Sequence, residues 1–301
     1  MQNKASLPKL LEGYDAGCLQ GDVEYSFWQL QIYCGLSLNS GENLVKLQQN
    51  ARKYAKKAMQ HNQLTVANGI VTLLSAVLEL TGDARSRDDA YENIFNCTED
   101  ALYKQLASSN EERACVLMCG KGKLVSVLKG DIDDAVQYYH MGLKHPQGSK
   151  IPTFNLIMGT FTDGLLAFIC AQKHRDDQGQ WTNVGLGVIR KMKSWMRSSP
   201  WNFENKVYLL EAEQHVLKGN FKLASGKYGA SIKAAQKHRF VHEEGLAFDR
   251  AGNFYLDRER KDDALLHFTQ AKKCYKRWGA QALVDRLAEK CNDIVHSVSF
   301  E

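Results

Sequence analysis

Two cysteines are the first candidates for chemistry, because Cys115 and Cys119 are four residues apart and would share one face of a helix. Thiolates at this spacing can supply two ligands to a zinc ion, but zinc needs four ligands, or three and a water. No second pair of cysteines or histidines follows at zinc-finger spacing, and Val116 to Met118 between them are apolar. The pattern favours two buried core thiols.

Histidines near two predicted helix ends form the second group of candidates. His140 and His145 stand where a cation is favoured by the C-terminal end of the helix dipole, so they are interpreted as capping residues. His238, His242 and Glu243 begin a His-Glu-x-x-His zinc motif, but a leucine occupies its last position. We interpret these three residues as part of a solvated loop.

Nucleotide and hydrolase motifs are incomplete or missing. The run Gly120 to Lys123 resembles part of a phosphate-binding loop, but the required spacing is absent and Leu124 follows where serine or threonine is needed. We interpret the run as a helix-flanking turn. The signatures of protein kinases and serine hydrolases do not occur. We expect no catalytic residue, metal or cofactor; the alternative is an enzyme or metal site that uses the cysteines and histidines above.

Charge and composition argue against nucleic acid and membrane partners. The net charge of +5 over 301 residues is mild. In the basic stretch Lys272 to Trp278, the lysines and the aromatic residues segregate to opposite sides of a helix, as in an ordinary amphipathic helix. The first eleven residues lack an apolar signal core, and eight scattered cysteines are typical of reduced thiols. We therefore expect a cytoplasmic protein.

Helices must position all of these side chains. Apolar residues recur every three or four positions, as in Ala224, Tyr228, Ile232 and Ala235, and no sustained alternation predicts a strand. Similar turns recur at Gly21-Asp22, Gly130-Asp131, Gly219-Asn220 and Arg260-Lys261. Glycine tolerates the positive φ that ends one helix, and Asp or Asn can cap the next. The sequence therefore predicts an all-α chain of helical hairpins.

The hairpins resemble the tetratricopeptide repeat. The range Gly130 to Pro146 matches best, with glycine, aspartate, alanine and an aromatic residue at the expected offsets. The interval from Gly219 to Arg260 is 41 residues rather than the usual 34, so we expect longer helices. The resemblance implies a tetratricopeptide-like solenoid of antiparallel helical hairpins.

Both ends of the chain are similar to the helical region that follows the ATPase domain in large multi-domain signalling proteins. The runs that carry this second resemblance are Leu11 to Cys34 and Phe254 to Leu287. Such proteins also carry a serine/threonine-kinase-like domain and often a sensor and histidine-kinase end. None of these catalytic domains is in the sequence, so the resemblance implies the helical regulatory region alone.

The expected organisation has two helical repeat regions, 1–175 and 200–301, joined by an irregular segment, 176–199, with one continuous solenoid as the alternative. Stacked hairpins leave a concave surface lined by the first helix of each pair, where a peptide can lie. The residues that repeat counting places on this partner-binding surface are Lys206, Leu209 and Glu213 of one hairpin and Asp249, Asn253 and Leu256 of the next.

At this surface Asn253 stands where peptide-binding repeats often carry an asparagine that contacts the peptide backbone. Asp249 replaces the lysine that would bind a terminal carboxylate, so a carboxylate clamp is not expected. The predicted function is a non-catalytic protein-interaction or regulatory module of a signal-transduction protein. Its partner would be a protein or peptide, including kinase or ATPase domains of a parent polypeptide. The alternative is a fragment of a multi-domain kinase or ATPase whose activity lies in domains absent here.

Overall fold

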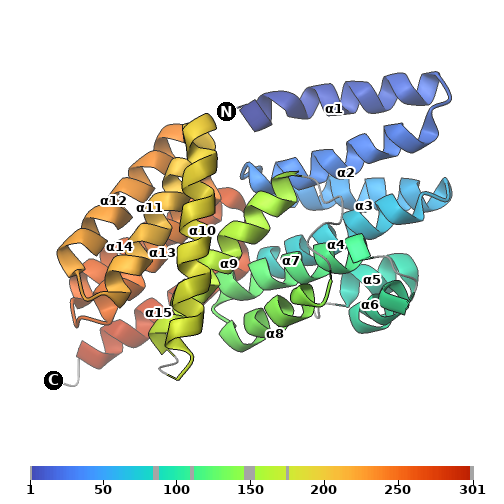
Figure 1. Ribbon diagram of the computed structural model, residues 1–301. Coiled ribbons are helices and arrows are strands. Elements are labelled where there is room, and N and C mark those ends of the chain that lie inside the picture. Colours follow the sequence, from blue (N-terminus) through green and yellow to red (C-terminus); the bar gives the residue numbers. More distant parts are fainter. Residues whose placement is uncertain (1, 84–87, 109–111, 146–152, 174–175, 299–301) are drawn as a thin grey trace. The chain divides into compact units, whose positions relative to one another are not determined.

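Helices account for the regular structure of the chain (Figure 1). The computed structural model describes residues 2–83, 88–108, 112–145, 153–173 and 176–298, which form fifteen α-helices and no strand. This confirms the all-α prediction. The helices are α1 (Gln2–Leu19), α2 (Val23–Asn39), α3 (Leu44–Gln60), α4 (Leu64–Thr81), α5 (Asp89–Phe95), α6 (Glu99–Ser108), α7 (Glu112–Lys129), α8 (Ile132–Leu143), α9 (Thr153–Lys173), α10 (Gln178–Ser198), α11 (Pro200–Leu217), α12 (Phe221–His238), α13 (Val241–Leu256), α14 (Lys261–Trp278) and α15 (Gln281–Val298).

The predicted turns join these helices into hairpins. Gly21, Gly130 and Gly219 have φ of 78°, 89° and 71°, which confirms the left-handed conformation expected of them. Asp22 caps α2 by accepting a hydrogen bond from the Tyr25 backbone N–H, as predicted, but the Asn220 side chain makes no such bond to α12. Pro146, expected to close the hairpin that begins at Gly130, lies outside the described residues.

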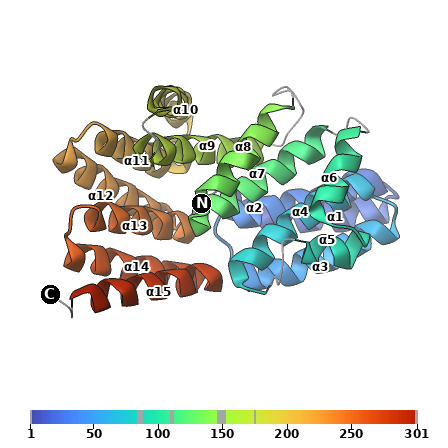
Figure 2. The same ribbon diagram turned by 90° about the horizontal axis from the view of Figure 1, so that it is seen from below.

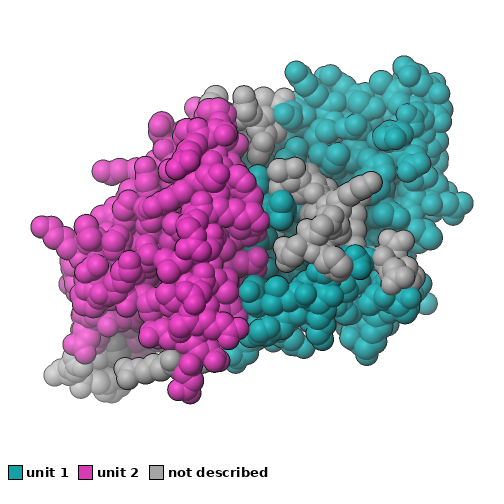
Figure 3. All heavy atoms as spheres, viewed as in Figure 1, with its two compact units in different colours: residues 1–126, 133–159 teal, residues 127–132, 160–301 magenta. Residues whose placement is uncertain are grey.

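Figure 3 colours the two compact units into which the chain divides. The first comprises residues 1–126 and 133–159, and the second comprises residues 127–132 and 160–301. The changes from one unit to the other fall inside α7, after the first residue of α8, and inside α9, rather than in an irregular linker. This division differs from the expected one at 176–199.

The segment expected to be irregular is the helix α10, which packs against α11. Within the segment 176–199, the residues that precede this helix are a turn, Asp176 and Asp177. Trp181, Gly185 and Val188 recur at helical spacing and are buried, and the aromatic ring of Phe168 fills the space beside Gly185. Packing of this face is what makes the segment helical despite its polar beginning.

Unit 1 contains the most apolar helix of the chain. Among the described residues, α4 alone is long and apolar enough to cross a membrane by length and composition. Inside unit 1, however, 72% of the helix is buried, and it packs against α2, α3 and α5. Its apolar character is therefore that of a core helix.

Unit 2 repeats one hairpin geometry (Figure 2). The helix α11 pairs with α12 and α13 pairs with α14, while α15 follows against α14. The first helices α11, α13 and α15 begin at residues 200, 241 and 281, so each hairpin takes about forty residues. Ala224 and Ala264 are fully buried in the second helices, as expected for small residues that let two helices approach closely.

The basic stretch of α14 has the orientation that its pattern predicts. Tyr275 and Trp278 are buried in unit 2, with exposed fractions of 0% and 1%. Lys273 and Lys276 are exposed on the other side of the helix. The helix is therefore amphipathic, with its aromatic residues in the core.

Candidate functional site

Charged side chains link the first helices of successive hairpins in unit 2. Four links join residues that are each 37 positions apart in the sequence, and together we call them the polar ladder. Two links join α11 to α13, and two join α13 to α15. The links are Lys206 to Glu243, Glu213 to Arg250, Asp249 to Arg286 and Asn253 to Lys290.

Glu213 has the most complete set of partners in the ladder. Its side chain is 0% exposed and accepts two hydrogen bonds from the Arg250 guanidinium, at 2.7 and 2.9 Å. Gln172 of α9 and Tyr228 of α12 donate to the same carboxylate, each at 2.9 Å. Burial alone would raise the pKa of Glu213, but the Arg250 charge and these donors hold it below its usual value. One carboxylate thus ties together four helices.

The link between Lys206 and Glu243 is also buried. The two side chains are 5% and 3% exposed, and the Lys206 ammonium lies 2.6 Å from one Glu243 oxygen. Asn205 also donates to Glu243, and Lys206 donates to the Asn202 carbonyl. Burial favours the neutral acid, but the Lys206 charge outweighs it and lowers the pKa of Glu243 to about 2.

The same link corrects the interpretation of the nearby histidines. His242 and Glu243, expected in a solvated loop with His238, are 7% and 4% exposed and lie in the first turn of α13. The His242 ring packs against the Trp278 ring at 5.3 Å between centroids. His238 lies 2.6 Å from a Glu204 carboxylate oxygen. The partners of these side chains lie on α11 and α14, far away in the sequence, so a local sequence pattern does not reveal their burial.

Asp249 and Asn253 form the links between α13 and α15. Asp249 accepts hydrogen bonds from the Arg286 guanidinium and, at 3.3 Å, from the Tyr275 hydroxyl. Burial alone would lower the pKa of Arg286, but the Asp249 charge raises it above its usual value. Asn253 donates to Asp249 and accepts a bond from the Lys290 ammonium.

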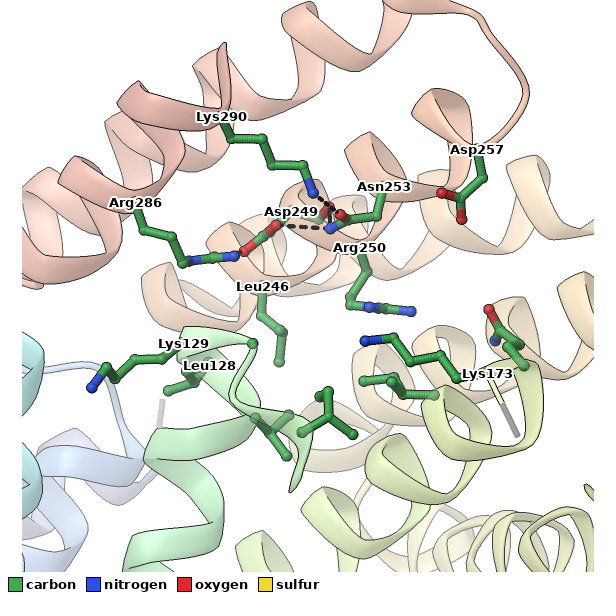
Figure 4. A pocket seen from close by; sticks show the side chains of 15 residues that line it. Leu128, Lys129, Lys173, Leu246, Asp249, Arg250, Asn253, Asp257, Arg286 and Lys290 are labelled. Atoms are coloured by element: carbon green, nitrogen blue, oxygen red, sulfur yellow. Dashed lines mark hydrogen bonds and ion pairs between the residues drawn. The ribbon is translucent and has the colours of Figure 1, made fainter. Parts of the chain in front are cut away.

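A pocket of about 520 Å³ lies beside these last two links, and all of its lining residues belong to unit 2 (Figure 4). Figure 4 shows Arg286 and Lys290 reaching from α15 toward Asp249 and Asn253, and Lys173 extending toward Arg250. Five basic, two acidic and several apolar residues line the pocket. The lining residues are Val127, Leu128, Lys129, Gly130, Ile132, Ile169, Gln172, Lys173, Leu246, Asp249, Arg250, Asn253, Asp257, Arg286 and Lys290.

The six residues predicted to line an open concave surface do not lie together on one such surface. Lys206, Leu209, Glu213 and Asp249 are at most 4% exposed, so they are packed between helices and do not form an open surface. The charged residues among them bond to partners on the neighbouring first helix and therefore act as interhelical links. Asp249 and Asn253 lie together in the pocket wall, whereas Leu256 is half-buried outside it.

Sequence reasoning missed the five basic residues of the pocket, namely Lys129, Lys173, Arg250, Arg286 and Lys290. A usable signal was present, because Glu213 and Arg250, and likewise Asp249 and Arg286, are opposite charges separated by 37 residues. This constant separation is close to one hairpin length. Comparing charges one repeat apart, rather than within a helix, would have revealed the ladder.

The other candidates for chemistry lie in unit 1. Cys115 and Cys119 are buried in α7, and burial raises the pKa of Cys119 to about 12, so this side chain remains a thiol at neutral pH. The run Gly120 to Lys123 lies inside α7 and is not the turn that we expected. Among the described residues, no group of three or more His, Cys, Asp or Glu side chains is arranged to hold a metal ion.

Comparison with known proteins gives no family for the chain. No protein-family model matches the sequence, and no curated protein matches it significantly. The functional argument therefore depends on the pocket and its chemistry.

Proposed function

We propose that this chain is a non-catalytic helical-repeat protein that binds a peptide or a partner domain and thereby regulates a cytoplasmic signalling system. In this proposal the hairpins of unit 2 are tetratricopeptide-like, and the partner contacts the side formed by their first helices. Kinase or ATPase domains of a parent polypeptide are among the partners that the resemblance at both ends of the chain implies.

The pocket beside α13 and α15 is the observation that carries this proposal. Its volume is about 520 Å³, and it combines apolar side chains with charged and amide groups that can orient and select a ligand. The polar ladder fixes the first helices that surround it, so that the pocket keeps its shape before a partner arrives. Such preorganisation reduces the entropy that binding costs.

Site-specific crosslinking tests the proposal. Asp257 is exposed at the pocket rim, and Lys233 is exposed on the second helix α12. The photo-reactive residue p-benzoylphenylalanine would replace each of them in turn, in the full chain. We expect the position 257 variant to capture a discrete partner from cell extract and the position 233 variant to capture none. Equal capture from both positions, or none from either, would contradict the proposal.

A further inference from the structure

Some basic groups of the pocket are paired with a carboxylate of the protein, and others are not. Arg250 is bound on two nitrogens by Glu213, and Arg286 is bound by Asp249. In contrast, the Lys290 ammonium bonds to the neutral Asn253 amide, and no carboxylate pairs with Lys173 in the described part of the chain. Within the described residues, two ammonium groups that line one pocket thus make no ion pair with a carboxylate.

A buried donor gives a second, independent indication. The Nε of Arg286 is buried and has no acceptor within the described residues, although its Nη2 bonds to Asp249. A buried N–H without an acceptor costs free energy, and an incoming oxygen ligand would remove this cost. Gly130 leaves room near the same guanidinium, because a Cβ at this position would come within 3.9 Å of the Arg286 Nη1.

The lining of the pocket also contains apolar side chains. Leu128, Ile132, Ile169 and Leu246 line the pocket alongside the charged residues. The volume of the pocket is several times that of a single carboxylate or phosphate group. A bound ion alone would therefore leave the apolar side chains in contact with water. A ligand that fills the pocket must carry both an anionic group and an adjoining apolar group.

From these observations we infer that the pocket recognises an oxyanion group, a carboxylate or a phosphate monoester, carried beside apolar side chains on a short segment of the partner. Lys173 and Lys290 bind the oxyanion, Arg286 donates its Nε, and Ile132 and Ile169 contact the apolar part. This inference rests on the proposed function, because it specifies the chemistry of the partner.

Methyl NMR on the full chain tests the inference with three matched probes. The probes are the tripeptide amides acetyl-Leu-Glu-Leu, acetyl-Leu-Gln-Leu and acetyl-Leu-phosphoserine-Leu. We expect the glutamate or the phosphoserine peptide to shift the Ile132 and Ile169 methyl signals in a saturable manner. The glutamine peptide should bind at least about tenfold more weakly than the tighter anionic peptide, since its amide carries no charge to strengthen the hydrogen bonds. The tighter of the two anionic peptides identifies whether a carboxylate or a phosphate is preferred.

Two variants that each remove one positive charge give the test and its control. Lys173→Gln removes an exposed lysine from the pocket, and Lys276→Gln removes an exposed lysine from α14. Both should melt at the wild-type temperature by circular dichroism. We expect Lys173→Gln to weaken the anionic peptide about tenfold and Lys276→Gln to leave its affinity unchanged.

The inference would be overturned by equal binding of the glutamine and anionic peptides, by binding of no probe, or by equal effects of the two variants. If a partner is crosslinked at position 257 but one of these results is obtained, the chain binds a partner and the anionic group is not what it recognises. Anion-dependent shifts without any crosslinked partner would instead retain the site and remove the partner-binding function.

Discussion

Buried charges in the polar ladder set the register between hairpins more than they add stability. An ion pair removed from water gains little net free energy, but removing one partner leaves an uncompensated charge. Glu213 is the extreme case, since its carboxylate is 0% exposed and holds Gln172, Tyr228 and Arg250 together. The cost of changing such a residue lies in the partners that it leaves behind.

Replacing Glu213 by glutamine should therefore destabilise the chain by about 3–5 kcal/mol, because the Arg250 guanidinium, 18% exposed, loses the carboxylate to which it is bound. Urea unfolding followed by circular dichroism measures this change. Asp100→Asn is the control, since Asp100 and its partner Lys104 are 71% and 74% exposed and their pair should contribute less than about 1 kcal/mol. Similar losses in both variants would show that the buried position has no special role.

Lys121 in α7 should destabilise the fold in a pH-dependent way. Burial lowers its pKa from 10.5 to about 8, so the unfolded chain binds this proton more tightly than the folded one. The penalty is complete below pH 8 and is relieved as pH rises toward 10.5. We expect Lys121→Met to raise the stability at pH 7 by about 3 kcal/mol, and by much less near pH 10.5. Urea titrations at both pH values measure this, and a gain that does not depend on pH would contradict the expectation.

At the scale of elements, helical hairpins pack an aromatic ring onto a glycine. In unit 2, a Cβ at Gly252 of α13 would lie 2.5 Å from the Phe268 ring of α14, and one at Gly245 would lie 2.8 Å from the Tyr275 ring. Both rings are fully buried, so they have little freedom to move. The glycines in α13 thus set how closely the two helices approach.

Gly252→Ala should destabilise the chain by about 1–3 kcal/mol, because displacement of the Phe268 ring outweighs the better helix propensity of alanine. The matched variant Gly226→Ala in α12 meets nothing within 4 Å and should stabilise by up to about 1 kcal/mol. Denaturant midpoints of the two variants measure the difference. Stabilisation by both substitutions would mean that the two helices can separate at little cost.

The elements that sequence predicted are those with local causes. Gly21, Gly130 and Gly219, each followed by Asp or Asn, end helices because glycine adopts positive φ without a steric penalty. The helix α10 was missed because its early residues are polar and its order comes from packing on α9 and α11. The ladder was missed for a related reason: whether Lys206 is exposed or buried depends on a helix that lies 37 residues away.

At the scale of the whole molecule, the cysteines report on both units at once. Of the eight thiols, Cys18 is exposed, Cys97 and Cys291 are intermediate, and the rest are buried. The buried group is divided between the units, with Cys34, Cys115 and Cys119 in unit 1 and Cys170 and Cys274 in unit 2. Thiol accessibility therefore samples the packing of each unit in a single experiment.

We expect one thiol of the native chain to react rapidly with a disulfide reagent, two to react slowly, and five to react only on unfolding. Mass spectrometry of the labelled chain identifies each site. Cys18→Ser should remove the fast phase alone. Labelling of the wild-type chain in guanidinium should detect all eight thiols. Rapid labelling of Cys34 or Cys170 in the native chain would mean that the unit containing it is packed more loosely than described.

The constant separation of 37 residues in the polar ladder also limits how the length of this protein can vary. One residue inserted inside α11, α13 or α15 would rotate every later side chain of that helix by about 100° and carry it away from its partner. An insertion in the turn at Gly219 leaves both helices in phase. Length differences among descendants of this sequence should therefore accumulate in the turns, while the first helices keep their residue counts.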